Sequence, residues 1–160
     1  QQFDLGFAEH RSEHPAIQRG QVWRGPMQVV LPPDHPLCRK ACITAADLHE
    51  QPLISQGTED PTQLRIDNLL IAEEVRPRIV AEAQLSASIG EMVANGVGLS
   101  IIEPVTALYF ANLGKVVSRP LTPEILFQYE LLIPALREPS RVATQFLEVV
   151  DTQFSELFDS

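Results

Sequence analysis

The sequence is poor in cysteine, tryptophan and basic residues, and it has no long apolar run. Its 160 residues include two cysteines, one tryptophan, and 12 lysines and arginines against 21 aspartates and glutamates. Proteins that bind the phosphate backbone of nucleic acids need clustered basic side chains. The net charge of −9 therefore argues against nucleic-acid binding by this chain. No apolar run approaches the roughly 18 residues of a membrane span, so we expect no membrane contact. A secretory signal pattern is also missing.

The two cysteines, Cys38 and Cys42, are four residues apart in CRKAC. Zinc ribbons use pairs with two intervening residues, and the sequence contains no second pair. We therefore expect no metal and no cofactor, and we interpret both residues as free thiols of a cytoplasmic protein. The sequence also lacks a GxSxG elbow, a P-loop, an HExxH motif and a dinucleotide fingerprint, so we predict no enzyme.

Apolar and polar patterns predict strands that alternate with helices. Hydrophobic residues make up 44% of the chain, which is ordinary for a globular protein. The alternation predicts βαβ units and a mostly parallel sheet. We expect strands at 3–8, 27–31, 52–55, 78–83, 98–102, 115–119 and 126–133, and helices at 61–75, 86–94, 105–110 and 140–158.

Several residues mark where the predicted helices begin and end. Asp60 is an N-cap candidate, and Pro61 follows it at the first helical position. Thr44 and Asp47 have the spacing of a capping box around a single helical turn. Gly96 ends the helix at 86–94 as its C-terminal cap.

Ligands of open α/β sheets bind beyond the carboxyl ends of strands, beside helix N-termini. The first such corner holds Ser55, Gln56 and Thr58, which lead into the helix that Asp60 opens. Free backbone N–H groups and the Thr58 hydroxyl can receive a carboxylate there. The alternative is a capped turn that binds nothing.

The second and third corners follow the strands at 78–83 and 98–102. Gln84 both donates and accepts hydrogen bonds, which suits an amino-acid-like ligand, whereas Ser86 is a ligand contact or simply the helix N-cap. Glu103, followed by Pro104, ends a buried strand, where a carboxylate is costly unless it is paired. It pairs with Lys115 or Arg119, or it contacts a cationic ligand.

The order of these segments resembles the effector-binding domain of LysR-type transcriptional regulators. The resemblance covers essentially the whole chain. It rests on FDLGFAE, PPDHPLCRKACITAADL, PLIS, AEAQLSASIGEMVANGVGLSIIEP and KVVSRPL, which occur in this order. Three of its segments, RIDNLL, AEAQLSAS and EPVTAL, are most similar to regulators of opine and basic amino-acid catabolism.

The resemblance implies an α/β fold with two lobes of the periplasmic-binding-protein type (type II), joined by two crossover strands. Residues 1–30 are then a partial lobe I with the first crossover strand, and residues 31–118 are a complete lobe II. Residues 119–160 are the second crossover and the C-terminal part of lobe I. The chain is then N-terminally truncated, without the winged helix-turn-helix and without the first strand and helix of the effector domain.

The same resemblance implies a function for the whole regulator. A small-molecule co-inducer, an amino acid or opine-like compound, binds between the lobes and controls DNA binding by the winged helix-turn-helix. The full-length protein is then a cytoplasmic homo-oligomer, a dimer or tetramer. Ala8 and Glu9 of lobe I reach the same cleft, with Glu9 as a second candidate for contacting a cationic head. The alternative is a secreted solute-binding protein of the same fold.

Overall fold

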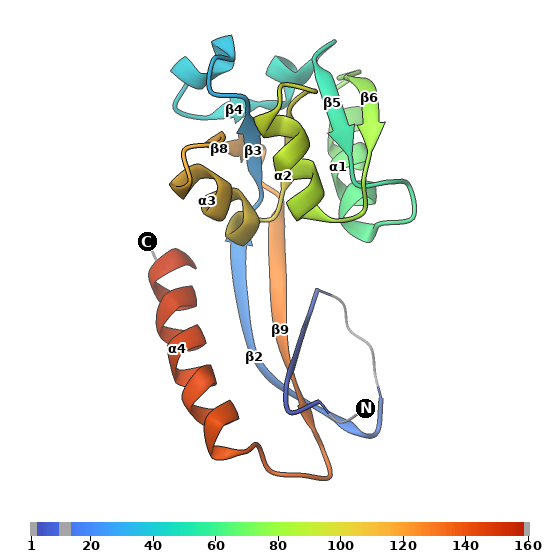
Figure 1. The fold of residues 1–160 in the computed structure, drawn as a ribbon. Helices are drawn as coiled ribbons and strands as arrows, with labels where there is room; N and C mark the ends of the chain where they lie inside the picture. Colours follow the sequence, from blue (N-terminus) through green and yellow to red (C-terminus); the bar gives the residue numbers. More distant parts are fainter. Residues whose placement is uncertain (1–2, 10–13, 159–160) are drawn as a thin grey trace. The chain divides into compact units, whose positions relative to one another are not determined.

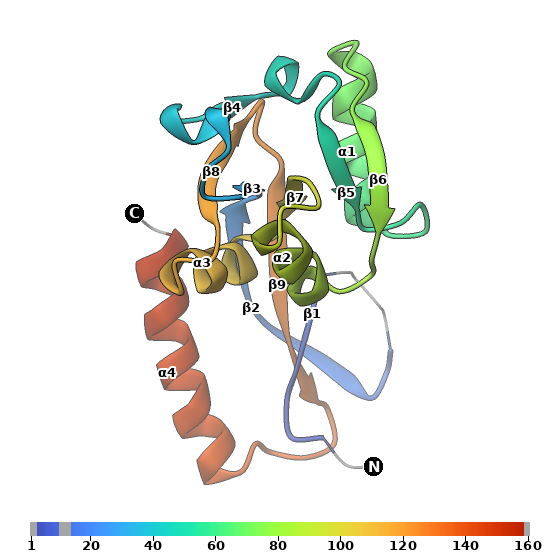
Figure 2. The same ribbon diagram turned by 45° about the horizontal axis from the view of Figure 1, so that its top comes forward.

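The computed structural model describes residues 3–9 and 14–158, which form two compact units. Unit 1 comprises residues 1–25 and 127–160, and unit 2 comprises residues 26–126. Ribbon views of the elements are given in Figures 1 and 2. The long strands β2 (Ile17–Pro26) and β9 (Leu126–Pro134) begin or end at the boundary between the units.

Unit 2 contains a four-stranded sheet in the order β4-β8-β3-β7. β3 is antiparallel to both of its neighbours, whereas β4 is parallel to β8. The expectation of a mostly parallel sheet is therefore wrong for this part of the chain. The bounds of these strands are β3 (Gln28–Leu31), β4 (Ile43–Thr44), β7 (Ser100–Ile102) and β8 (Val117–Thr122).

The predicted βαβ unit does form beside this sheet. β5 (Pro52–Ser55) and β6 (Arg78–Glu82) are parallel, and helix α1 (Pro61–Ala72) connects them. The N–H of Ile54 donates to the carbonyl of Leu99 at 2.9 Å, so β5 also joins the segment that leads into β7. Parallel pairing brings the carboxyl ends of β5 and β6 to the same edge.

Helices α2 (Ser86–Ala94) and α3 (Pro104–Asn112) pack together over β3 and β7. The apolar residues of this contact form one buried cluster because the helices meet closely at Gly90. A Cβ atom there would lie 2.4 Å from the Phe110 ring. The cluster consists of Val30, Ile54, Ile89, Val93, Ile102, Ala107, Phe110 and Val116.

The predicted helix signals of unit 2 are confirmed, with one exception. Asp47 accepts from the N–H of Thr44 at 3.0 Å, as a capping box requires. Gly96 has φ 76°, and the N–H groups of Gly96 and Val97 donate to Val93 and Met92, which is a Schellman motif. Ser86 is the first residue of α2, and Leu85 is the N-cap without a side-chain hydrogen bond. The assignment of Ser86 as the cap is thus wrong by one residue.

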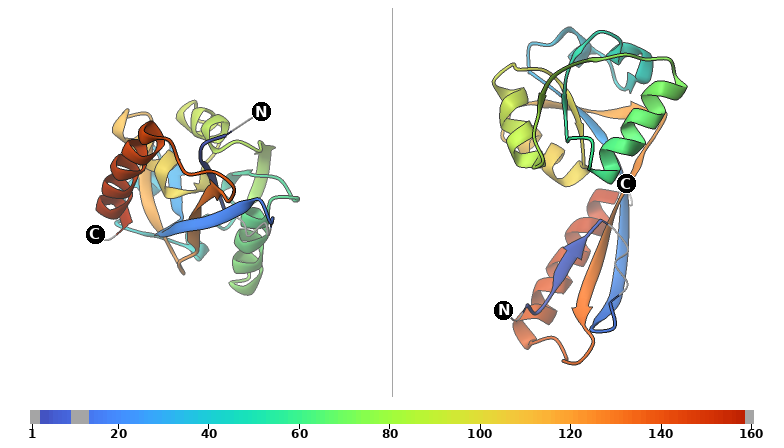
Figure 3. Two further views of the ribbon diagram at one scale, coloured as in Figure 1. Left: turned by 90° about the horizontal axis from the view of Figure 1, so that it is seen from below. Right: turned by 90° about the vertical axis from the view of Figure 1, so that its right-hand side faces the viewer.

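Unit 1 is a three-stranded sheet in the order β1-β9-β2, with β1 at Gly6–Ala8. Helix α4 (Arg141–Phe158) covers one face of this sheet (Figure 3). The sequence predicts β9 and α4 but not β2, whose IQRGQVWRGP has no clear alternation of apolar residues. Residues 17–26 form a strand because they pair with β9, a contact that the local sequence pattern does not reveal.

An aromatic contact holds α4 to the sheet of unit 1. The Trp23 ring lies 5.1 Å from the Phe154 ring, and the Nε1 atom of Trp23 donates to Asp151 at 3.3 Å. Some apolar residues of α4 stay exposed, since Val142 and Val149 retain 75% and 61% of their accessible surface. In the described part of the chain, no helix is long and apolar enough to span a bilayer.

A pocket at the carboxyl ends of strands β5 and β6

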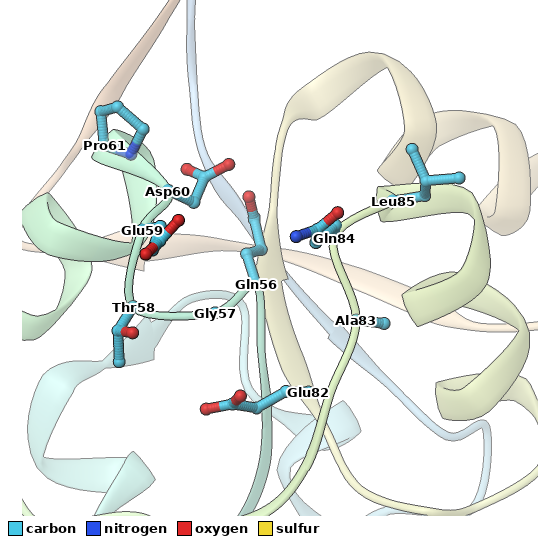
Figure 4. Close-up of a pocket in the computed structure, with 10 residues that line it drawn as sticks. All are labelled: Gln56, Gly57, Thr58, Glu59, Asp60, Pro61, Glu82, Ala83, Gln84 and Leu85. Atoms are coloured by element: carbon cyan, nitrogen blue, oxygen red, sulfur yellow. The ribbon is translucent and has the colours of Figure 1, made fainter.

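Unit 2 contains a pocket of about 700 Å³ where β5 and β6 end (Figure 4). One wall is the loop from β5 into α1, and the other is the segment that joins β6 to α2. This is the position that open α/β sheets offer to ligands. The lining residues are Gln56, Gly57, Thr58, Glu59, Asp60, Pro61, Glu82, Ala83, Gln84 and Leu85.

The first wall turns sharply directly after β5. Gly57 has φ 93°, a backbone conformation that residues with a Cβ atom rarely adopt. Its N–H donates to Ser55 Oγ at 3.0 Å. Ser55 is itself 4% exposed, so its hydroxyl accepts this bond as a buried group. The turn places Thr58, Glu59 and Asp60 along the rim.

The N-terminus of α1 is capped from within the chain. Asp60 Oδ1 accepts from the N–H groups of Thr62 and Gln63 at 2.7 and 3.2 Å. Leu64 donates its N–H to the Asp60 carbonyl at 3.0 Å, and Pro61 has no N–H to offer. The first turn of α1 therefore uses its own donors. The N–H groups of Thr62 and Gln63 are therefore taken by the N-cap, and the carboxylate contact expected at this corner stays a prediction for the loop before Asp60.

Gln56 forms the floor of the pocket and is only 6% exposed. Its backbone N–H donates to Gln63 Oε1 at 2.9 Å, and Gln63 Nε2 in turn donates to Asp67 at 2.7 Å. Its side-chain Nε2 donates to the carbonyl of Ile101 at 3.2 Å. These bonds fix both the backbone and the amide of Gln56 before any ligand arrives.

The charged side chains that line the pocket are carboxylates. In Figure 4 the side chains of Glu59 and Asp60 lie on the loop after β5 with the Gln84 amide opposite Asp60, and the Glu82 side chain lies below Gly57. Among the lining residues in the described part of the chain, none is lysine or arginine. The pocket therefore presents oxygen acceptors and negative charge.

The structure brings some of the predicted site residues together and separates others. Gln56, Thr58 and Gln84 line the pocket, and Ser55 supports it. Ser86 begins α2 next to the lining segment. Ala8 and Glu9 belong to unit 1, and Ala8 pairs with Glu130 in the sheet.

Glu103 and Pro104 stand at the start of α3 rather than in the pocket lining. Both carboxylate oxygens of Glu103 accept from the N–H of Thr106, at 3.1 and 3.0 Å. The two expected cationic partners have other contacts. Lys115 pairs with Glu91 at 2.6 Å, and Arg119 donates to the carbonyls of Lys40 and Cys38. The structure thus makes Glu103 a helix cap, as Asp60 is for α1.

The sequence prediction missed Glu59 and Glu82 as pocket residues. Both lie at the corners that we predicted from the rule that ligands bind beyond the carboxyl ends of strands. Glu59 follows Thr58, and Glu82 ends β6. The rule locates the corner, but it does not say which side chains turn inward. The available signal was the high density of acidic residues at two corners that parallel pairing brings together.

The described thiols and carboxylates form no metal site. Within residues 3–9 and 14–158, no group of three or more histidine, cysteine, aspartate or glutamate side chains is placed to hold an ion. Cys38 donates its Sγ hydrogen to the carbonyl of Pro32 at 3.3 Å, and Cys42 is exposed.

The two thiols are expected to react at different rates. Burial raises the pKa of Cys38 above its ordinary value, outweighing the hydrogen bond from His35 and the charge of Arg119, which lower it. Because the thiolate is the nucleophile, Cys42→Ser should label with iodoacetamide more slowly than Cys38→Ser at pH 8. The difference between the two labelling rates should become smaller as the pH rises and a larger fraction of Cys38 ionises. Equal rates at pH 8 would contradict the raised pKa that partial burial gives Cys38.

Comparison with known proteins identifies the family. The sequence model of the LysR substrate binding domain matches residues 1–155. The chain belongs to this family. Over 146 residues it is 32% identical to the transcriptional activator LysR of Escherichia coli K12, a match that covers 91% of the chain and 47% of that protein. It is 25% identical over 146 residues to the regulatory protein NocR of Agrobacterium tumefaciens T37, covering 91% and 48%.

Solved LysR-family structures share the fold. The CcmR regulatory domain of Synechocystis PCC6803, solved in complex with 2-PG, gives a TM-score of 0.70 at 21% identity, over 91% of this chain and 71% of that one. The QuiR effector-binding domain in complex with shikimate gives 0.67 at 18%, over 98% and 74%. The predicted α/β, periplasmic-binding-protein-like (type II) fold is therefore confirmed.

The LysR substrate-binding domain is an effector-binding regulatory module and not an enzyme, so the predicted class is confirmed. Relatives of this domain bind small molecules such as 2-PG and shikimate. The chain spans about half the length of the curated LysR and NocR proteins that it matches.

Proposed function

We propose that the pocket at the ends of β5 and β6 is part of the effector site of a LysR-type regulator. The observation that carries the proposal is the pre-formed floor at Gln56, whose backbone and amide are fixed at the meeting point of two parallel strands. A site that is ordered before binding loses little conformational freedom when the ligand arrives. Gln56, Thr58 and Gln84 contact the effector, and Ser55 supports the turn.

The effector is an amino acid or opine-like compound. Support comes from the similarity of RIDNLL, AEAQLSAS and EPVTAL to regulators of opine and basic amino-acid catabolism, and from the matches to LysR and NocR. Ala8, Glu9, Glu103 and Pro104 remain further candidates for effector contacts on the resemblance alone.

The regulator acts in the cytoplasm as a dimer or tetramer. Residues 1–30 and 119–160 contribute the partial lobe I and the crossovers, and residues 31–118 form lobe II. Effector binding shifts the oligomer between two arrangements and so changes DNA binding by a winged helix-turn-helix outside this chain. Only a difference in effector affinity between the two arrangements produces such a shift.

Thermal denaturation of the chain with a panel of amino acids, opines and carboxylates tests the proposal. A compound at 100 times its Kd should stabilise the fold by about 2.7 kcal/mol. Gln84→Ala should weaken that stabilisation without changing the unliganded midpoint, because Gln84 is exposed. Gln128→Ala in unit 1 is the matched control and should leave the ligand response intact.

A shift that survives Gln84→Ala unchanged would contradict an effector contact at this corner. The regulatory claim needs the full-length protein, in which the same compound should alter the affinity for operator DNA in a mobility-shift assay. Binding of the compound without any change in DNA affinity would contradict the proposed control of transcription.

A further inference from the structure

We infer that this pocket, whose lining includes Gln56, Glu59 and Glu82, receives a cationic group of the effector, an ammonium or a guanidinium. The inference rests on the proposed function, because it specifies the effector class of the same site. Three features of the pocket support it independently: the orientation of one amide, the charge of the walls, and the capped end of α1.

The amide of Gln56 has only one possible orientation. Its Nε2 donates to the carbonyl of Ile101, and a carbonyl can only accept, so the nitrogen must be on that side. The oxygen Oε1 then faces the pocket, and Figure 4 shows it directed into the space between Asp60 and Gln84. Within the described residues, this oxygen has no hydrogen-bond partner.

An acceptor that faces the pocket from a side chain held in place by its other bonds is available to a donor of the ligand. A ligand ammonium or guanidinium carries several N–H donors and no acceptor, so it matches Oε1 directly. A ligand carboxylate would place oxygen against oxygen at the floor of the site.

The charged residues of the pocket walls also favour a cation over an anion. Glu59 lies on one wall and Glu82 on the other, so each wall adds negative charge to the pocket. Hydrogen bonds between a cation and a carboxylate are roughly twice as strong as neutral ones. An anion in this pocket would meet like charges without a lysine or arginine among the described lining residues to offset them.

The helix terminus, which is the usual anion site of such folds, is occupied by the chain itself. Asp60 takes the N–H groups of Thr62 and Gln63, and its carboxylate also adds negative charge to the rim. A carboxylate of the effector would have to displace this cap to reach the N–H groups of Thr62 and Gln63. This pocket therefore differs from sites in which the first turn of the helix binds an anion.

Isothermal titration of the chain with three probes tests the inference. Agmatine carries a guanidinium and an ammonium without a carboxylate, L-norvaline has an amino-acid backbone with an apolar side chain, and glutarate carries two carboxylates. We expect agmatine to bind more tightly than L-norvaline and glutarate to bind least. Glu59→Gln and Glu82→Gln should each weaken agmatine binding by roughly three- to tenfold.

Glu73→Gln is the matched control, because it removes the same charge from unit 2 at the C-cap of α1, outside the pocket lining. It should change agmatine affinity by less than about twofold. Equal weakening by Glu73→Gln and Glu82→Gln would show attraction by the net charge alone and would overturn the inference.

Two other outcomes separate this inference from the proposed function. If glutarate binds more tightly than agmatine and Gln84→Ala abolishes glutarate binding, the pocket is an effector site for anions and only the inference fails. If no probe binds at millimolar concentration and no compound of the wider panel responds to Gln84→Ala, both the inference and the proposed function fail.

Discussion

Gly90→Ala is expected to destabilise the chain by about 1–3 kcal/mol, although alanine is the better helix former. The added Cβ would lie 2.4, 2.6 and 2.8 Å from three carbons of the Phe110 ring. Phe110 is 2% exposed and belongs to the buried cluster between α2 and α3, so its ring cannot move into solvent without loss of packing. The steric cost therefore exceeds the propensity gain of about 1 kcal/mol.

Urea denaturation followed by circular dichroism measures this change. Ser88→Ala is the control, because Ser88 is an exposed residue of the same helix and its substitution should stay within about 0.5 kcal/mol. In a Phe110→Leu background the smaller side chain should accept the new methyl group, so Gly90→Ala should cost less there. An equal cost in both backgrounds would show that the loss does not come from the Phe110 contact.

Gln63→Leu is expected to cost about 1–3 kcal/mol and to weaken effector binding as well. Gln63 is 3% exposed, and its Oε1 is the acceptor for the backbone N–H of Gln56. Leucine has a similar size but no acceptor, so a buried N–H loses its partner while the packing volume is nearly kept. The floor of the pocket then loses one of the two bonds that fix it.

Asp67→Ala separates the two roles of Gln63. It removes only the outer bond, from Gln63 Nε2 to Asp67, and leaves the Gln56 contact in place. Its effect on denaturant stability should be well below that of Gln63→Leu, and ligand affinity should change little. If Asp67→Ala matched Gln63→Leu in both measurements, the Gln56 bond would not be the reason for either loss.

The start of α1 was predictable because it is set by local chemistry, whereas α2 begins after Leu85, which makes no side-chain cap bond. Asp60 and Pro61 are adjacent in the sequence, and a cap needs no information about distant residues. A residue that caps a helix occupies donors that a ligand would otherwise use, so the predicted cap at Asp60 also limits which N–H groups of α1 can receive a carboxylate.

Other features depend on contacts between distant segments, and local patterns do not reveal them. β2 is ordered by pairing with β9, more than one hundred residues away in the chain, and its own residues alternate poorly. The orientation of the Gln56 amide depends on Ile101, 45 residues further on. The position of the pocket could be predicted from the ends of the strands. Its negative charge and the orientation of the Gln56 oxygen could be read only from the folded structure.

An NMR titration of the ¹⁵N-labelled chain with agmatine tests the central claim most directly. The largest backbone shifts should fall on Gln56, Gly57 and Glu59 and on the segment from Glu82 to Leu85, with the Gln56 side-chain amide moving too. Glutarate at the same concentration should leave these signals in place. If agmatine moved only signals outside both pocket walls, or if glutarate moved the same set more strongly, the pocket would not be a site for the cationic group of an effector.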